Sequence, residues 1–385
     1  MKKIILMLFA ICIAYAGCGK KESKKYSERK ENKTDTVKYI EKEKFKLMDF
    51  LSDNPGLMQK TDSIFNSLSD EEKIGQMIVA AAGVNGNPSA EVASLIKKKT
   101  VGGILILGGS MQSYEKEISY FRNLAKESGC LPIIFSADAE PSLINLKISG
   151  VKQFPKTISI KDKKESEEIA KSICEILKKI GVIQNFAPVC DVGVNAEVIG
   201  DRAFSKKPEI VKELASAFIR ETQKEGLIAT AKHFPGHGYA KGDSHKSLVT
   251  IDGELKELDQ FKSAIENDSV LSVMLGHIAV NNSKYDTNGY PATLNRKIVT
   301  NLLKDEMKFK GLIITDAMNM GALNKFDKPS FNAIKAGVDM VLMPKNESTL
   351  IDLVKNEMNK NHEFKKQIEA SVKKIIKLKI CLNLI

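Results

Sequence analysis

LIATAKHF, residues 227–234, is an apolar run that ends in a lysine, a histidine and a phenylalanine. Short runs that are apolar almost throughout are typical of strands buried on both faces, as in a parallel sheet. Seven further runs of this kind recur along the chain, each followed by polar or glycine-rich residues: IGQMIVAAA (74–82), VGGILIL (101–107), LPIIFSAD (131–138), VIQNFAPV (182–189), VLSVMLGHI (270–278), LIITDAM (312–318) and VDMVLMP (338–344). The sequence therefore predicts eight buried strands.

The segments between these runs have the spacing of amphipathic helices. Residues 163–179 and 208–225 place apolar side chains three or four positions apart among charges, and a final helix is expected over about 347–378. Strands alternating with helices predict an α/β protein. We expect a single TIM-type (β/α)₈ barrel, with a doubly wound open sheet as the competing arrangement.

Polar side chains gather where the predicted strands end. Four different strands end in them, and the residues are Asp138, Lys232, His233, His277 and Asp316. Barrel enzymes build their sites from the carboxyl ends of several strands, whereas an open sheet usually binds ligands at one switch point. The spread over four strands favours the barrel.

The first residues predict export. Two lysines precede an apolar run at 4–16, which is too short to span a bilayer comfortably, and Tyr15-Ala16-Gly17-Cys18 resembles a bacterial lipobox. Because Tyr15 stands where leucine is usual, an ordinary signal peptide cut nearby is the alternative. We expect a lipoprotein signal peptide at 1–17, a lipid on Cys18 within a charged, disordered tether at 18–46, and the barrel at 47–385.

The formal net charge of +11 does not by itself identify a partner. The lysines are spread over the whole chain, and no basic block carries interleaved aromatic residues. Nucleic acid is therefore not expected as a partner. The cysteines beyond Cys18 show no metal-binding spacing, and Cys174 and Cys190 lie among apolar residues, so we expect them to be buried small hydrophobic side chains.

AKHFPGHGYAKGDSHK, residues 231–246, holds three of the five histidines of the chain. Pro235 and the glycines around it turn the chain sharply. Asp243 and His245 are two positions apart, so the carboxylate can orient the imidazole and raise its basicity for proton transfer near neutral pH. A capped turn would also explain Asp-Ser-His, and a zinc site using His233, His237, Asp243 and His245 is a further alternative.

Asp316 follows the predicted strand within the run LIITDAM (312–318). A carboxylate partly buried at a barrel mouth needs hydrogen-bond donors or a positive charge to meet. The oxocarbenium-like centre of a glycosidase is such a charge. The alternative is that Asp316 only caps a helix.

KHFPGHG (232–238) followed by DSH (243–245) resembles the signature of glycoside hydrolase family 3, in its β-N-acetylglucosaminidase branch. Other segments resemble the family in the same order: LSDEEKIGQMIV (68–79), FAPVCDVGVNAEVIGDRAF (186–204), VMLGHIAV (273–280), PATLN (291–295), GLIITDAMNMGAL (311–323), AGVDMVLMP (336–344) and SVKKIIKLK (371–379). The resemblance covers about residues 50 to 380.

The resemblance implies a role for each matching residue. Asp316 matches the nucleophile that forms a covalent glycosyl-enzyme, and His245 matches the general acid/base, paired with Asp243. Residues expected to hold sugar hydroxyls are Asp138, Arg202, Lys232 and His233. His237 is expected to shape the turn. Neither a metal nor an organic cofactor is expected.

One segment departs from the family pattern. The family usually has Asp-x-Glu-Gly-Gly-Arg after the third strand, whereas this chain has Asp138-Ala139-Glu140-Pro141-Ser142-Leu143. A changed shape of this loop would shift substrate preference or weaken activity. A glycan-binding lipoprotein that has lost turnover is the resulting alternative.

The resemblance implies a retaining exo-β-N-acetylglucosaminidase. Its expected substrates are peptidoglycan fragments, with chitin oligosaccharides or host glycans as alternatives, and a family 3 β-glucosidase is the alternative enzyme. We expect a monomer in the cell envelope, held to a membrane by the lipid on Cys18.

Overall fold

The computed structural model describes residues 44–385. The predicted signal peptide, Cys18 and nearly all of the predicted tether lie outside the described residues. Residues 44–385 form one compact unit. Within them, none of the helices combines the length and the apolar composition needed to cross a bilayer.

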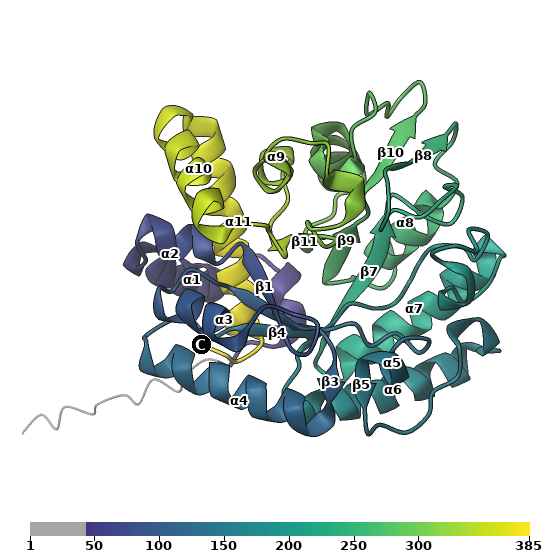
Figure 1. Cartoon of the computed structure of the whole chain (residues 1–385), viewed down its shortest axis with the longest axis horizontal. Helices are drawn as coiled ribbons and strands as arrows, with labels where there is room; N and C mark the ends of the chain where they lie inside the picture. Colours follow the sequence, from purple (N-terminus) through teal and green to yellow (C-terminus); the bar gives the residue numbers. More distant parts are fainter. Residues whose placement is uncertain (1–43) are drawn as a thin grey trace, which may run out of the picture. The chain divides into compact units, whose positions relative to one another are not determined.

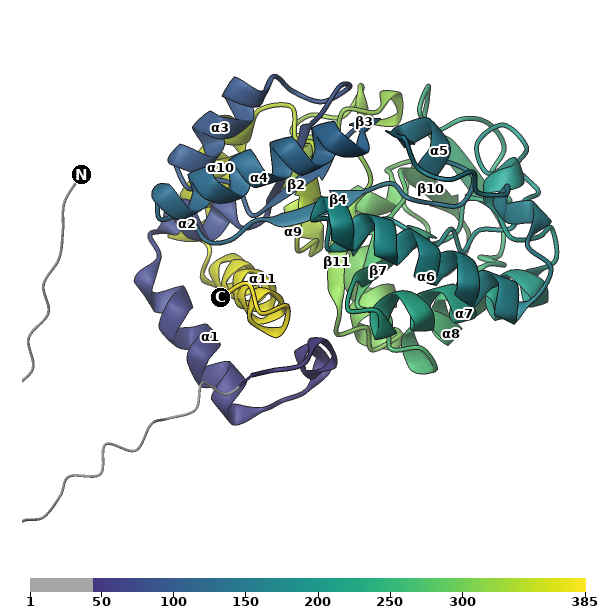
Figure 2. The same ribbon diagram turned by 90° about the horizontal axis from the view of Figure 1, so that it is seen from below.

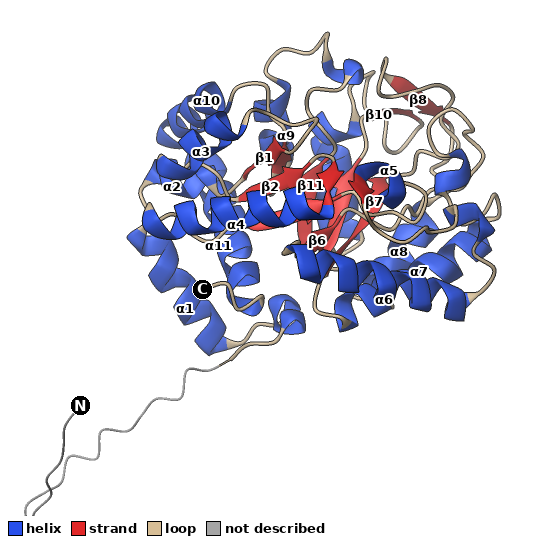
Figure 3. Ribbon diagram, turned by 60° about the horizontal axis from the view of Figure 1, so that its bottom comes forward, coloured by secondary structure: helices blue, strands red, loops and turns tan. Residues whose placement is uncertain are grey.

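Eight strands form one parallel sheet in the order β11-β9-β7-β6-β4-β2-β1-β12. Each of the eight predicted runs contains one of them. Figure 3 shows these strands at the centre of the molecule with helices around them. The strands are β1 (Ile78–Ala82), β2 (Gly103–Ile106), β4 (Ile134–Ala137), β6 (Gln184–Asn185), β7 (Ile228–Phe234), β9 (Ser272–Leu275), β11 (Leu312–Thr315) and β12 (Val341–Leu342).

The two ends of the sheet meet and close the barrel. The backbone N–H group of Thr315 in β11 donates to the carbonyl oxygen of Met340 at 3.1 Å, and Ile314 and Met340 form a parallel bridge. The barrel strands are buried along their whole length, as the largely apolar runs that contain them predict. The fold is therefore the expected TIM-type barrel.

Helices cover the outside of the barrel (Figure 1). The predicted helix at 163–179 shows why they form. Asp162 caps its first turn by accepting the N–H group of Glu165, its apolar face is buried, and Gly181 ends it with a left-handed φ of 85°. The helices are α1 (Pro55–Ser67), α2 (Asp70–Gly75), α3 (Ser89–Lys97), α4 (Met111–Glu127), α5 (Ile144–Lys147), α6 (Lys163–Ile180), α7 (Pro208–Lys224), α8 (Leu258–Glu266), α9 (Pro329–Ala336), α10 (Glu347–Lys360) and α11 (His362–Cys381).

Shorter helical segments and two small sheets complete the architecture. A π-helix covers Lys297–Glu306. The small parallel pairs are β3 (Gly109–Ser110) with β5 (Ile148–Ser149), and β8 (Val249–Asp252) with β10 (Ile278–Asn281). The 3₁₀ segments are η1 (Leu47–Leu51), η2 (Thr157–Ser159), η3 (Gly200–Arg202), η4 (Ala292–Leu294) and η6 (Gly321–Leu323).

The prediction of one final helix over 347–378 was wrong. The segment is two helices, α10 and α11, which meet at Asn361. Asn361 has extended backbone angles, and its side chain accepts the N–H group of Phe364, so it ends one helix and caps the next. α11 packs against α1, the first helix of the barrel domain (Figure 2).

All four cysteines of residues 44–385 are free and buried: Cys130, Cys174, Cys190 and Cys381. The prediction for Cys174 and Cys190 is confirmed. Burial raises the pKa of the Cys174 thiol to about 12, which keeps it protonated and unreactive at neutral pH.

Candidate active site

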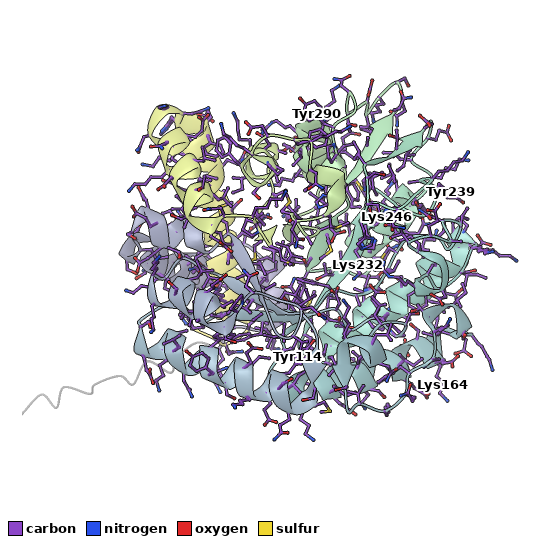
Figure 4. The ribbon with its side chains drawn as sticks, in the orientation of Figure 1. Tyr114, Lys164, Lys232, Tyr239, Lys246 and Tyr290 are labelled. Carbon is purple, nitrogen blue, oxygen red and sulfur yellow. The ribbon has the colours of Figure 1, made fainter. Side chains whose placement is uncertain are left out.

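A cavity of about 470 Å³ opens at the carboxyl ends of the strands. Six of the seven predicted catalytic and sugar-binding residues line it: Asp138, Arg202, Lys232, His233, His245 and Asp316. They come from segments following β4, β6 and β11 and from β7 with its loop. Figure 4 places Lys232 near the middle of the barrel. The seventh, Asp243, reaches the site through its hydrogen bond to His245.

Lys232 lies in a buried cluster of charges. Its Nζ atom is 2.6 Å from Oε1 of Glu140 and 3.1 Å from Oδ1 of Asp138. Arg202 donates from Nε and Nη2 to the two oxygens of Glu140, at 3.0 and 2.7 Å. This bidentate pairing fixes the guanidinium plane beside the cavity.

The cluster keeps its charges despite burial. Burial alone would raise the pKa of Glu140, but Arg202 and Lys232 lower it further than burial raises it. Burial would lower the pKa of Lys232, but the Glu140 and Asp138 carboxylates reverse this and leave the pKa raised. Asp138 keeps 22% of its side chain exposed toward the cavity, so it remains available to a ligand.

His233 is held by a carboxylate beneath it. Asp191 is fully buried, and its Oδ2 atom is 2.6 Å from Nδ1 of His233. Asp191 also accepts the backbone N–H groups of His233 and His237. Because Nδ1 is taken by Asp191, the Nε2 side of His233 is the part free to meet a ligand.

Asp243 and His245 form the predicted pair. The Nδ1 atom of His245 is 2.8 Å from Oδ1 of Asp243, and the His245 backbone N–H group donates to the same oxygen. Burial would raise the pKa of Asp243, but these hydrogen bonds lower it further. The imidazole is 59% exposed, so its second nitrogen can meet a substrate that enters the cavity.

Asp316 follows β11 and caps no helix. The next helical segment, η6, has Met320 at its cap position, and Asp316 accepts the N–H group of Ala317 at 2.7 Å. Burial would raise the pKa of Asp316, but the imidazoles of His233 and His277 outweigh burial and leave the pKa below its usual value. The carboxylate is therefore ionised at neutral pH.

Comparison with a family model identifies the family to which this chain belongs. The model of the glycosyl hydrolase family 3 N-terminal domain matches residues 69–378. The chain belongs to glycosyl hydrolase family 3.

The relatives of this family 3 chain carry hexosaminidase names. It is 28% identical over 333 residues to β-hexosaminidase A of Pseudoalteromonas piscicida, covering 75% of this chain and 55% of that protein. It is 29% identical over 273 residues to the β-hexosaminidase of Photobacterium profundum, covering 68% of this chain and 80% of that protein. Among solved structures, a family 3 β-N-acetylglucosaminidase from Paenibacillus sp. superposes with a TM-score of 0.75 at 29% identity, covering 83% of this chain and 63% of that one. The family 3 chain thus spans 55% of the first relative's length.

The segment that departs from the family pattern is held by hydrogen bonds to neighbouring loops. Ser142 accepts the Thr157 N–H group at 2.8 Å and donates its hydroxyl to the carbonyl oxygen of Asp201 at 2.8 Å. Leu143 lines the cavity where the family usually has arginine. Glu140 keeps its ion pairs, so the change alters one wall of the cavity and leaves the charge cluster intact.

The sequence interpretation missed several residues that the structure places at the site. Asp191 supports His233, and Glu140 pairs with both Lys232 and Arg202. Asp191 stands two positions after the run that contains β6 (182–189), so its place beyond a strand end was a usable signal. Glu257 gave no signal, because it is one of several charged residues just before α8; it accepts the N–H groups of Val192 and Gly238 beneath the histidine loop.

His237 belongs to the support of the loop, as expected. It is buried, and its Nε2 atom lies 2.8 Å from Oγ of Ser244. Within residues 44–385, no group of three or more His, Cys, Asp or Glu side chains is arranged to hold a metal ion.

Proposed function

We propose that this protein is a retaining exo-β-N-acetylglucosaminidase, with Asp316 as nucleophile and His245 as general acid/base. One observation carries the proposal: an ionised Asp316 and the Asp243–His245 pair meet at one cavity. The hexosaminidase names of the relatives supply the sugar. Lys232, Arg202, His233 and Asp138 complete the cavity as donors and acceptors for sugar hydroxyls.

In the first step, a carboxylate oxygen of Asp316 forms a bond to the anomeric carbon as the glycosidic bond breaks. His245 gives its proton to the leaving oxygen, and Asp243 stabilises the imidazolium from which that proton comes. The product left on the protein is a covalent glycosyl-enzyme with inverted anomeric configuration.

In the second step, water replaces the aspartyl ester. The now neutral imidazole of His245 takes a proton from water, whose oxygen forms a bond to the anomeric carbon while the bond to Asp316 breaks. The second inversion restores the original configuration. A histidine in this role places no second anion beside Asp316, whereas most glycosidases use two carboxylates.

Substrate source and location belong to the same proposal. Peptidoglycan fragments fit an amino-sugar glycosidase in the cell envelope, and the lipobox-like sequence that ends in Cys18 is the basis for placing the protein there. A glycan-binding protein without turnover is not favoured, because the Pro141-Ser142-Leu143 change leaves Glu140 and its two cations paired.

The test is hydrolysis of 4-nitrophenyl β-N-acetylglucosaminide by the full chain. Wild-type protein should release nitrophenol and form the β-anomer first, as seen by NMR. Asp316→Ala should nearly abolish release, and His245→Ala should lower kcat by about 10²–10⁴-fold, the usual contribution of general acid–base catalysis. The exposed His362 and Asp352 supply matched controls, and His362→Ala and Asp352→Ala should leave the rate unchanged.

An absence of wild-type release, with N-acetylglucosamine still bound, would instead identify a glycan-binding protein. An initial α-anomer would contradict the double displacement.

A further inference from the structure

The acid–base loop, defined as residues 235–246, touches the segment that follows Asp316. The backbone N–H group of Gly321 donates to the carbonyl oxygen of His245 at 3.0 Å, and that of Ala322 donates to the carbonyl oxygen of Ser244 at 3.3 Å. Gly321 and Ala322 open η6, which follows the β11 strand end. The backbone that carries the proposed acid/base therefore rests on the backbone that carries the proposed nucleophile.

Ser244 supplies a second anchor, which ties the end of the loop to His237 at its base. It is 2% exposed, although its neighbours His245 and Lys246 point outward. Nδ2 of Asn195 lies 3.4 Å from Nδ1 of His237 and can donate to it, which leaves a proton on Nε2 of His237 for the Ser244 hydroxyl at 2.8 Å. Burial lowers the pKa of His237, so the neutral ring suited to this relay is the stable form.

The close approach requires a glycine at 321. A Cβ atom there would lie 2.4 Å from the carbonyl oxygen of Lys246 and 2.6 Å from that of His245. Both are backbone atoms, so no side-chain rotation relieves the clash. The φ of Gly321 is outside the left-handed region, and the three atoms nearest to the added Cβ all belong to the docked loop, so the clash of an alanine here falls on that loop.

We propose that Gly321 and Ser244 are positioning residues that hold the Asp243–His245 pair against the Asp316 segment. This inference rests on the proposed function and adds to it the reason why the dyad keeps its place on an exposed loop. The Gly321 contact acts on the backbone of the loop, the Ser244 hydroxyl contacts the side chain of His237, and neither involves the Asp243–His245 hydrogen bond. A displaced loop would therefore lose proton transfer while Asp316 kept its nucleophilic role.

Leaving-group chemistry separates this role from a general loss of structure. 2,4-Dinitrophenolate departs without a proton, whereas phenol needs the general acid. In the second step, azide forms its bond to the anomeric carbon as the bond to Asp316 breaks, and it needs no general base. An enzyme with a displaced His245 should therefore keep activity on the activated substrate and respond to azide.

The variants are Gly321→Ala and Ser244→Ala, made in the full chain. Gly311→Ala is the matched control, because its Cβ would also clash, at 2.5 Å from the Phe309 ring and 2.7 Å from the carbonyl oxygen of Leu271, but just before β11 at the opposite end of the barrel.

For Gly321→Ala, kcat/KM on the phenyl glycoside should fall about 10²-fold or more, within the range of general acid catalysis, and about fivefold or less on the dinitrophenyl glycoside. Azide should raise its kcat on the dinitrophenyl glycoside, with glycosyl azide as product. For Ser244→Ala, the kcat/KM values on the two glycosides and the response to azide should change in the same direction as for Gly321→Ala, but by smaller factors.

Equal losses on both glycosides, or no loss, would overturn the proposal. Hydrogen exchange tests the docking without any substrate: the amides of residues 321 and 322 should exchange at least tenfold faster in Gly321→Ala and unchanged in Gly311→Ala. Unchanged exchange would overturn the docking. If wild-type protein hydrolyses neither glycoside, the proposed function fails, and the exchange result still decides whether these residues hold the loop.

Discussion

At the scale of single residues, Glu140 is the strongest constraint on the site. It is 1% exposed and forms ion pairs with both Lys232 and Arg202. Glu140→Gln would leave two buried cations without their shared partner, and breaking a buried pair costs about 3–5 kcal/mol. We expect the free energy of unfolding in urea to fall by that amount and KM to rise, while the exposed Glu127→Gln changes neither.

The pH dependence of this loss has a defined sign. The folded-state pKa of Glu140 lies below that of an unfolded glutamate, about 4.3. The stability it contributes is therefore fully present above about pH 4.3 and is lost as pH falls through the folded-state pKa. The difference between wild type and Glu140→Gln should be constant from pH 6 to 8 and shrink below about pH 4. A difference that grows on acidification would contradict this assignment.

The sequence predicted the residues that line the cavity better than it predicted the residues that support them. Asp138, Lys232 and Asp316 stand at strand ends, and a strand end fixes a side chain at the barrel mouth. The residues that support these side chains are positioned by loops instead. Asp191 meets His233 across 42 positions, and no local pattern specifies how a loop brings a carboxylate under a ring.

At the scale of elements, the predicted strands were all present but shorter than their apolar runs. β6 and β12 pair over only two residues each, although the runs around them are largely apolar. Apolar composition indicates burial, and residues such as Phe186 and Met340 are buried beyond the paired segment. The missed break at Asn361 has the same origin, because both helices bury apolar faces and only the cap separates them.

Glu257, just before α8, connects three elements: α8, the segment after β6 and the acid–base loop. It accepts the N–H groups of Val192 at 2.6 Å and Gly238 at 2.9 Å. Burial and the nearby Asp191 raise its pKa to about 8. A carboxyl whose folded-state pKa is raised contributes stability that is present below about pH 4.3 and is lost as pH rises toward 8.

Glu257→Gln should remove that slope. We expect the unfolding free energy of the variant, measured in urea between pH 5 and 8, to fall less steeply with pH than that of wild type. The exposed Glu266→Gln, at the end of α8, is the control and should follow wild type. Parallel curves for wild type and Glu257→Gln would show that the carboxyl is already ionised across this range.

At the scale of the whole molecule, the first and last parts of the barrel domain are joined by a buried lysine. Lys379 in α11 donates from Nζ to Oε1 of Gln76, just after α2, at 2.6 Å, across 303 positions of sequence. No carboxylate pairs with Lys379 among the ion pairs of residues 44–385. Burial lowers its pKa to about 7.

The sign of the resulting pH dependence is opposite to that of Glu257. Between about pH 7 and the unfolded value of about 10.4, the unfolded chain binds the proton more tightly than the folded one, so this group makes stability rise with pH.

Lys379→Met keeps an unbranched apolar chain and removes the charge. The variant should be more stable than wild type at pH 6, and the gain should shrink steadily toward pH 9. Urea unfolding at pH 6, 7.5 and 9 measures this, with the exposed Lys365→Met on the same helix as control. A variant that is less stable than wild type at pH 6 would show that the Gln76 hydrogen bond outweighs the burial of the charge.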